Sequence, residues 1–145
     1  MLYEVKIEDQ DGEEVIYIGN PENEGESKKI TSLIVELDTI NDQSLQKSNA
    51  MLAKIEIVGL LDSSIKGEII KLFNWAKEQN AEKWYRNIEI KVKTSSDNVY
   101  RTYKFDNVFI LDYKETYTDE SESNKNYFTV NLTQKENNFK KLDSY

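Results

Sequence analysis

The sequence predicts a mainly β fold: a small antiparallel β-barrel or β-sandwich with one amphipathic α-helix at about residues 62–79. Two observations predict this class. Short segments in which apolar and polar residues alternate recur along the chain, as in strands that bury one face. A single segment, residues 62–79, has the apolar spacing of a helix instead.

The first predicted element is a β-hairpin. Tyr3, Val5 and Ile7 alternate with charged residues, which indicates a strand with one wet face. The Asp11-Gly12 dipeptide is a typical hairpin turn, and residues 14–18 form the predicted partner strand.

Two further strands are predicted over residues 30–40 and 52–60, where apolar residues again alternate with polar ones. Two polar segments, residues 19–29 after the first hairpin and residues 41–50 between these two strands, show neither the strand period nor the helix period. Segments of this composition are surface loops.

The helix is predicted to begin at one of three N-cap residues, Asp62, Ser63 or Ser64. Trp75 lies away from the centre of the predicted apolar stripe, which favours packing at the edge of the core. The stripe itself consists of Ile65, Ile69, Leu72, Phe73 and Ala76.

The C-terminal half predicts three more strands and a polar tail at residues 135–145. Residues 88–92 alternate, residues 95–98 form a turn, and Phe128 begins the apolar face of the last strand. Val108–Leu111 is apolar on both faces, which indicates either a central strand or one that is pressed against a neighbouring molecule.

Composition excludes several classes of protein. The chain has 145 residues, enough for one domain over residues 1–145, and it lacks histidine and cysteine. Without these residue types, a Cys nucleophile, a His general base and most zinc sites are absent. We therefore expect no enzymatic activity, no cofactor and no metal.

Charge and hydropathy also limit the partners. The net charge is −8, and no run of Lys or Arg is long enough to bind nucleic acid specifically. The N-terminus does not resemble a signal peptide, and no apolar run approaches the ~20 residues that cross a bilayer. We expect synthesis in the cytoplasm and no membrane partner.

Two further kinds of site can be considered. Carboxylate pairs such as Asp38 with Asp42, or Asp112 with Glu115, could serve acid–base chemistry. In a chain with 27 acidic residues, neighbouring carboxylates are expected on a solvated surface without any function. Tyrosine and phenylalanine side chains could form a sugar-binding platform, although in β proteins they more often pack in the core.

Four segments together resemble a known superfamily. They are residues 29–40 (KITSLIVELDTI), residues 54–73 (KIEIVGLLDSSIKGEIIKLF), residues 105–117 (FDNVFILDYKETY) and residues 127–135 (YFTVNLTQK). Their order, with a strand that ends in aspartate before a single helix, resembles the inner-tube proteins of contractile injection machines. These are the hemolysin-coregulated protein of type VI secretion and the tail-tube proteins of phages.

The resemblance implies a tube-like β-barrel domain that assembles into stacked rings, most often hexameric, in a phage tail or a phage-derived injection system. The implied partners are copies of the chain and other tube, sheath or baseplate proteins. Candidate interface residues are Leu45, Val108 and Ile110, and Leu45 packs either on an adjacent subunit or on its own barrel. Two alternatives remain: a tube-terminating or baseplate protein of the same fold, and a carbohydrate-binding β-sandwich.

Overall fold

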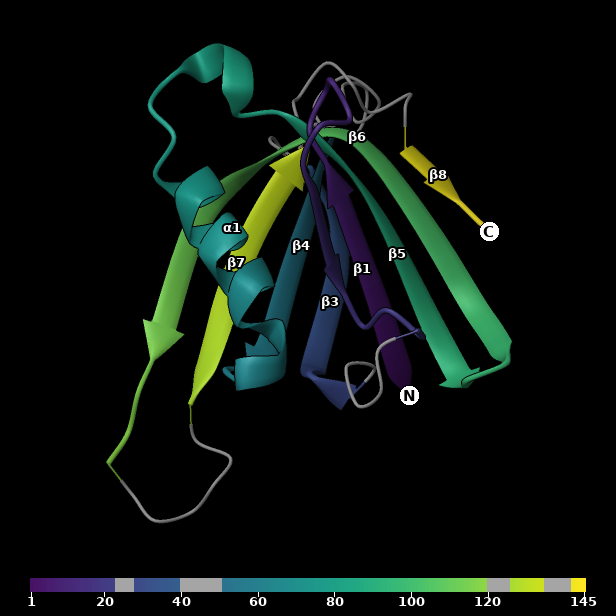
Figure 1. The fold of residues 1–145 in the computed structure, drawn as a ribbon. Helices are drawn as coiled ribbons and strands as arrows, with labels where there is room; N and C mark the ends of the chain where they lie inside the picture. Colours follow the sequence, from purple (N-terminus) through teal and green to yellow (C-terminus); the bar gives the residue numbers. More distant parts are fainter. Residues whose placement is uncertain (23–27, 40–50, 120–125, 135–141) are drawn as a thin grey trace.

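The computed structural model describes residues 1–22, 28–39, 51–119, 126–134 and 142–145. Within these ranges the chain forms one antiparallel sheet of eight strands and one α-helix, α1 (Figure 1). The strands are β1 (Leu2–Glu8), β2 (Val15–Ile18), β3 (Ile30–Thr39), β4 (Met51–Leu60), β5 (Arg86–Ser95), β6 (Asn98–Thr116), β7 (Tyr127–Gln134) and β8 (Leu142–Ser144). Their order is β2-β1-β5-β6-β7-β4-β3, and β8 pairs separately with β6.

The predicted fold class is confirmed in its main features. The predicted strand over residues 14–18 is observed as β2, and the two that follow are observed as β3 and β4, each within one residue of its predicted bounds. One element was missed, because the tail predicted to be polar contains β8. This short strand pairs with Tyr103–Phe105 of β6.

The longest strand, β6, has 19 residues and turns a corner in the middle. Its first half pairs with β5 as far as Val108, and from Val108 onward it pairs with β7. Asn107 stands at the corner with a φ of 57°, a left-handed conformation that asparagine tolerates better than most residues. The pairing with β5 shifts register between Arg86 and Ile88, as expected where a β-bulge bends a strand.

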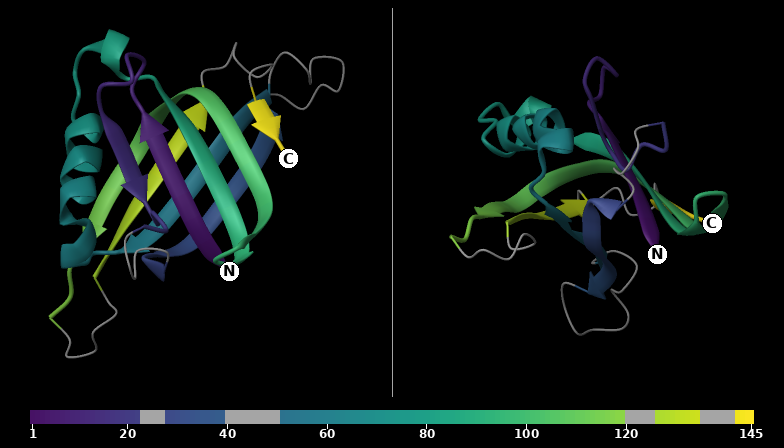
Figure 2. Two further views of the ribbon diagram at one scale, coloured as in Figure 1. Left: turned by 45° about the vertical axis from the view of Figure 1, so that its right-hand side comes forward. Right: turned by 60° about the horizontal axis from the view of Figure 1, so that its bottom comes forward.

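Because β6 bends, the sheet folds into two layers that face each other (Figure 2). We call β2, β1, β5 and Asn98–Val108 of β6 the front layer. The remainder, Val108–Thr116 of β6 with β7, β4 and β3, is the back layer. The two ends of the described sheet, β2 and β3, do not pair with each other, so of the predicted barrel or sandwich the structure has the sandwich-like form, an open sheet folded over on itself.

The space between the layers holds the hydrophobic core. The alternation that predicted β4 and β7 is observed, since Ile55 and Ile57 of β4 lie opposite Leu132 and Val130 of β7 and all four are buried. The remaining buried apolar residues are Val5, Ile7, Ile16, Ile18, Ile30, Ala53, Ile65, Ile69, Leu72, Trp75, Ile88, Ile90, Phe105, Val108 and Phe128.

The predicted helix is present but shorter than residues 62–79. A 3-10 turn, η3 (Ser63–Ile65), leads into α1 (Lys66–Ala76). Asp62 is the N-cap, and its carboxylate accepts hydrogen bonds from the Ser64 amide at 2.8 Å and from the Lys29 ammonium at 2.9 Å. These two donors lower the pKa of Asp62 to about 2.

The buried face of α1 differs from the predicted stripe at two positions. Trp75 is 3% exposed and its indole N–H donates to the Trp84 carbonyl at 2.9 Å, whereas Phe73 is 50% exposed. Ala76 is also exposed. The helix is rotated because Glu68 and Lys71 bond to the edge of β2, which carries Trp75 inward and Phe73 outward.

An ion pair is buried in the front layer. Glu4 of β1 and Lys93 of β5 are 6% and 8% exposed, and their charged groups are in contact. The Tyr17 hydroxyl donates a hydrogen bond to the same Glu4 carboxylate. Burial by itself raises the pKa of Glu4, but the hydrogen bonds from Lys93 and Tyr17 outweigh it and hold the pKa below 4.5.

We expect Trp75→Ala to destabilise the subunit far more than Phe73→Ala. Loss of a buried Trp side chain costs about 3–5 kcal/mol, while the half-exposed Phe73 should cost about 1 kcal/mol. Urea denaturation of the two variants at one protein concentration measures the difference. Equal losses would show that the helix buries the face predicted from sequence.

The buried pair predicts a defined pH dependence. Because the pKa of Glu4 is lower in the folded state, its stabilising effect is complete above about pH 4.5 and is lost as pH falls through the folded pKa. Glu4→Gln leaves Lys93 buried without a counter-charge and should cost about 3 kcal/mol at pH 7. The difference between wild type and variant should shrink below pH 4.5, and a gap that is constant from pH 7 to pH 3 would contradict this assignment.

Candidate functional site

The carboxylate pairs considered from sequence do not form an acid–base site. Asp38 pairs with Lys54 at 3.1 Å, and Asp42 lies outside the described residues. Asp112 lies opposite Asn131 and Glu115 opposite Phe128, so the two carboxylates project from opposite faces of β6. Among the residues that the structure describes, no group of three or more acidic side chains could hold a metal ion.

The exposed large apolar side chains are gathered on two sides of the molecule. Apart from Met1 and Tyr145 at the chain ends, they lie on two groups of elements, here called flanks, which Figure 2 shows on different sides of the molecule. Ile34 and Leu111, one from each flank, also border a shared cleft on the face of the back layer turned away from the core. The helix flank comprises α1, the segment from β6 to Tyr117, and Trp84; the strand flank comprises β3 and the tip of the β5–β6 hairpin. The helix flank carries Ile70, Phe73, Trp84, Leu111 and Tyr117, and the strand flank carries Ile34, Leu37, Val99 and Tyr100.

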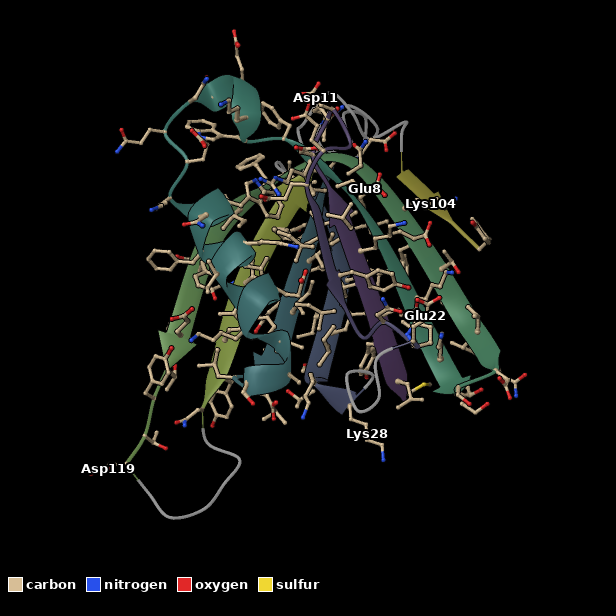
Figure 3. The ribbon with its side chains drawn as sticks, in the orientation of Figure 1. Glu8, Asp11, Glu22, Lys28, Lys104 and Asp119 are labelled. Carbon is tan, nitrogen blue, oxygen red and sulfur yellow. The ribbon has the colours of Figure 1, made fainter. Side chains whose placement is uncertain are left out.

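The charged side chains labelled in Figure 3 lie elsewhere. Asp11 marks the end of the molecule formed by the β1–β2 turn, and Lys28 and Asp119 lie at the opposite end. Lys104 projects from the front-layer half of β6, where its ammonium lies 3.7 Å from Glu89. The labelled charges lie at the two ends and on the front face, but charged residues also border the helix flank, among them Lys66, Glu78 and Glu115.

Two clefts open on the helix flank, on either side of the contact between Phe73 and Tyr113, whose ring centroids are 6.3 Å apart. The first has a volume of about 430 Å³ and the second about 290 Å³. The first is lined by Leu61, Asp62, Ser63, Lys66, Ile69, Ile70, Phe73, Glu115 and Tyr117, and the second by Trp75, Ala76, Glu78, Trp84, Phe109, Ile110 and Leu111.

The backbone edges of the sheet differ in whether other groups cover them. The outer edge of β2 is covered by α1, because Glu68 accepts from the Tyr17 amide at 2.8 Å and Lys71 donates to the Val15 carbonyl at 3.0 Å. Glu68 and Lys71 also pair with each other at 3.3 Å. Side chains thus occupy the hydrogen-bonding groups of an edge that could otherwise bind another strand.

The back layer, in contrast, has two edges without a strand partner among the described residues. β3 pairs only with β4, and residues 110–116 of β6 pair only with β7. One edge lies on the strand flank and the other on the helix flank. Since all neighbours in the layer of β6, β7, β4 and β3 are antiparallel and their number is even, β3 and β6 run in opposite directions.

The three candidate interface residues have different positions in the structure. Val108 is fully buried in the core of the subunit itself, and Leu45 lies outside the described residues. Ile110 is half-buried and lines the smaller cleft. The interface assignment of Leu45 and Ile110 stays a prediction, while Val108 has no surface that a neighbour could contact.

Sequence reasoning missed the most exposed apolar residues of the helix flank, Leu111 and Tyr117, which are 58% and 68% exposed. Leu111 stands at the register shift between Ile110 and Asp112, where β6 and β7 lose their regular pairing. The apolar run Val108–Leu111 was the available signal, but the run alone does not say which of its members faces outward.

The chain has the Hcp fold. The structure is similar to a double mutant of the Hcp1 protein from the E. coli EAEC 042 pathovar, with a TM-score of 0.63 and 14% identity over 100% of this chain and 98% of the other. The chain thus spans nearly the full length of this relative.

Components of extracellular injection particles share the fold. In the sheath–tube complex of the PVC contractile injection system in its extended state, one chain matches with a TM-score of 0.58 and 12% identity, covering 99% of this chain and 87% of that one. In the baseplate of the anti-feeding prophage, solved with six-fold symmetry, the TM-score is 0.54 with 10% identity, covering 99% and 91%. No protein-family model and no curated protein matches the sequence.

The structure also bears on the membrane expectation. Of the helices in the described ranges, none is long and apolar enough to span a membrane.

We expect the side chains on the β2 edge to stabilise the subunit and to keep that edge from associating. Lys71→Ala removes the donor to the Val15 carbonyl and should lower the free energy of unfolding by about 1 kcal/mol. Lys77→Ala, at the exposed position directly after α1, is the control and should change it by less than about 0.5 kcal/mol. Urea denaturation measures both, and equal effects would contradict the edge contact.

Proposed function

We propose that this protein is a structural subunit of the inner tube of a phage tail or of a phage-derived contractile injection system. Copies associate side by side into a closed ring of six, and rings stack into a tube. The observation that carries the proposal is the pair of unpaired back-layer edges on opposite flanks. The similar structures of tube and baseplate proteins support it.

The edges are complementary in direction and in side chains. If β3 of one copy pairs with residues 110–116 of β6 in the next, the new pair is antiparallel, as are the other pairs of the layer. The exposed Ile34 of β3 then approaches the exposed Leu111 of the neighbour, because both side chains border the same face of the back layer. Such a contact joins two different surfaces, so it is heterologous and forms a ring when the rotation between copies closes.

In a closed ring, one face of the back layer would point toward the bore and the other away from it. One face packs against the front layer and α1, so the other face lines the bore. That second face carries the polar side chains of Glu36 from β3, Lys54 and Glu56 from β4, and Asn131 from β7, and the exposed Ile34 and Leu111 border it at its two edges. A polar, hydrated wall is suited to a passage through which another macromolecule moves.

The ring size of six is supported by the symmetry of the anti-feeding prophage baseplate, which contains a chain of this fold. The similarity to that baseplate also keeps the second candidate function, a terminating or baseplate protein of the same particle. A tube protein forms rings that extend into stacks, and a terminating protein forms rings that do not. The partners in either case are copies of this chain and further components of the particle.

A carbohydrate-binding module is less well supported by the structure. Sugar sites combine an aromatic platform with nearby polar groups that fix the hydroxyls. The exposed aromatic side chains Phe73 and Trp84 line two separate clefts, and in the first cleft the Glu115 carboxylate already accepts hydrogen bonds from the Tyr113 and Tyr117 hydroxyls.

We expect a charge on either back-layer edge to prevent assembly while leaving the subunit folded. Ile34→Lys and Leu111→Lys replace half-exposed side chains with lysine, a residue that protects edge strands from pairing. Light scattering and negative-stain microscopy should show rings for wild type and monomers for both variants.

The control for this experiment is Lys104→Glu, which changes charge on the front-layer face and should still form rings. Each variant should keep the circular dichroism spectrum of the wild type. A wild-type protein that remains monomeric over a wide concentration range, in low and in moderate salt, would refute the proposed function.

A further inference from the structure

The larger cleft of the helix flank has an apolar wall that the described parts of its own chain leave open. Its volume is about 430 Å³, and Ile70 and Phe73 on α1 are each 50% exposed beside it. Tyr117, which closes the far side, is 68% exposed. Apolar surface of this kind on a folded subunit marks a place where another surface binds.

The chain segment next to this cleft cannot supply an apolar cover. Tyr117 leads into residues 120–125, whose sequence is ESESNK and contains no apolar side chain. On the polar side of the cleft, Glu115 already accepts hydrogen bonds from the Tyr113 and Tyr117 hydroxyls at 2.8 and 3.1 Å. The polar rim is therefore satisfied, and the apolar wall is what remains to be covered.

The strand flank offers a surface of matching character. The tip of the β5–β6 hairpin carries Val99 and Tyr100, which are 51% and 65% exposed. The pairing of β8 with β6 is continued by Tyr145, which exchanges backbone hydrogen bonds with Thr102, and these contacts stop short of Tyr100. The hairpin thus presents two large side chains at the end of a rigid two-stranded ribbon.

Position favours a contact between these surfaces in adjacent copies. Figure 1 shows the β5–β6 hairpin and the N-terminal end of α1 at the same end of the molecule, and Figure 2 shows them on opposite sides of it. Both belong to the side of the subunit that covers the core face of the back layer. When β3 of one copy meets β6 of the next, the hairpin tip is carried toward the neighbour's α1.

Charges at the borders of the two surfaces are complementary. Lys66 stands on the rim of the cleft and is exposed, and Asp97, in the turn of the hairpin, is exposed as well. An ion pair between them contributes little energy at a surface, but it favours this orientation over the reverse one.

We propose that the cleft between α1 and the end of β6 binds the tip of the β5–β6 hairpin of an adjacent copy, with Tyr100 as the inserted side chain. The inference rests on the proposed ring and adds to it a second contact outside the bore wall. The strand edges set the register between copies, and the hairpin holds the subunits together at a larger radius. A heterologous contact made at two radii resists hinging between subunits better than one made at the bore alone.

The test uses the absence of cysteine from the chain, which lets engineered pairs report contacts without background. The double variant Ile70→Cys with Tyr100→Cys is oxidised in dilute solution and analysed on a non-reducing gel. We expect a ladder of crosslinked species that ends at the ring and collapses to monomer on reduction. Each single variant should remain largely monomeric on the gel, and so should the pair Ile70→Cys with Lys104→Cys.

A second pair, Ile34→Cys with Leu111→Cys, reports the strand-edge contact separately. A ladder from the edge pair without one from the Ile70 and Tyr100 pair overturns the hairpin contact and leaves the proposed function intact. Absence of rings by light scattering, together with no ladder from either pair, overturns both. A fast-migrating monomer from the Ile70 and Tyr100 pair would show an internal contact and would also overturn the inference.

The affinity between copies tests the hairpin contact independently of the crosslinks. Tyr100→Ser should raise the concentration at which half of the protein is assembled at least tenfold, because aromatic anchors in pockets dominate interfaces. Lys104→Ser on the same strand is the matched control and should leave it within about twofold. Unchanged assembly of Tyr100→Ser would refute the role of the hairpin, and an intramolecular disulfide between Ile70→Cys and Phe139→Cys would show that the chain's own tail occupies the cleft.

Discussion

The architecture depends on the corner that β6 turns near Asn107. Before the corner the strand pairs with β5 on one side and with β8 on the other, and after it the strand is an outer member of the back layer. The left-handed φ of Asn107 and the register shift opposite Arg86–Ile88 make the change of direction possible without breaking the hydrogen-bonded ladder. Val108, the residue shared by both pairings, is fully buried, so the corner is also the point where the two layers meet in the core.

The same corner creates the free edges. Once β6 leaves β5, residues 110–116 have lost a strand on that side, and the helix approaches this region with side chains rather than with backbone. At β2 the helix supplies groups of both kinds, a carboxylate for the amide of Tyr17 and an ammonium for the carbonyl of Val15. One helix thus closes one edge of the sheet and borders another that stays open, which limits lateral growth to the back layer.

The sequence predicted the elements well because each has a strong local period. Alternation in β4 and β7 identifies residues such as Ile55 and Val130 that are buried in the structure, and the apolar spacing of residues 62–79 locates α1. The rotation of α1 could not be predicted, since it depends on Glu68 and Lys71 reaching a strand about fifty positions away in the chain. Trp75 is therefore buried and Phe73 half-exposed, whereas the sequence placed Phe73 in the apolar stripe and Trp75 at its edge.

The candidate interface was harder to predict for a similar reason. The run Val108–Leu111 is apolar on both faces, and only the bend at Asn107 and the shift at Ile110 decide that Val108 points inward and Leu111 outward. The short strand β8 depends on an edge of β6 that is formed by residues forty positions earlier. Tertiary pairing, which a single sequence does not display, settles both cases.

Net charge and apolar surface have opposite effects on the proposed assembly. A net charge of −8 makes copies of the subunit repel one another without regard to direction, and salt screens that repulsion. Attraction is confined to the flanks, where Ile34 and Leu37 accompany one open edge and Leu111 accompanies the other. Backbone hydrogen bonds across such edges act only at one distance and in one register. In the proposed ring, repulsion is general and attraction is directional, so lateral association is favoured edge to edge over front face to front face.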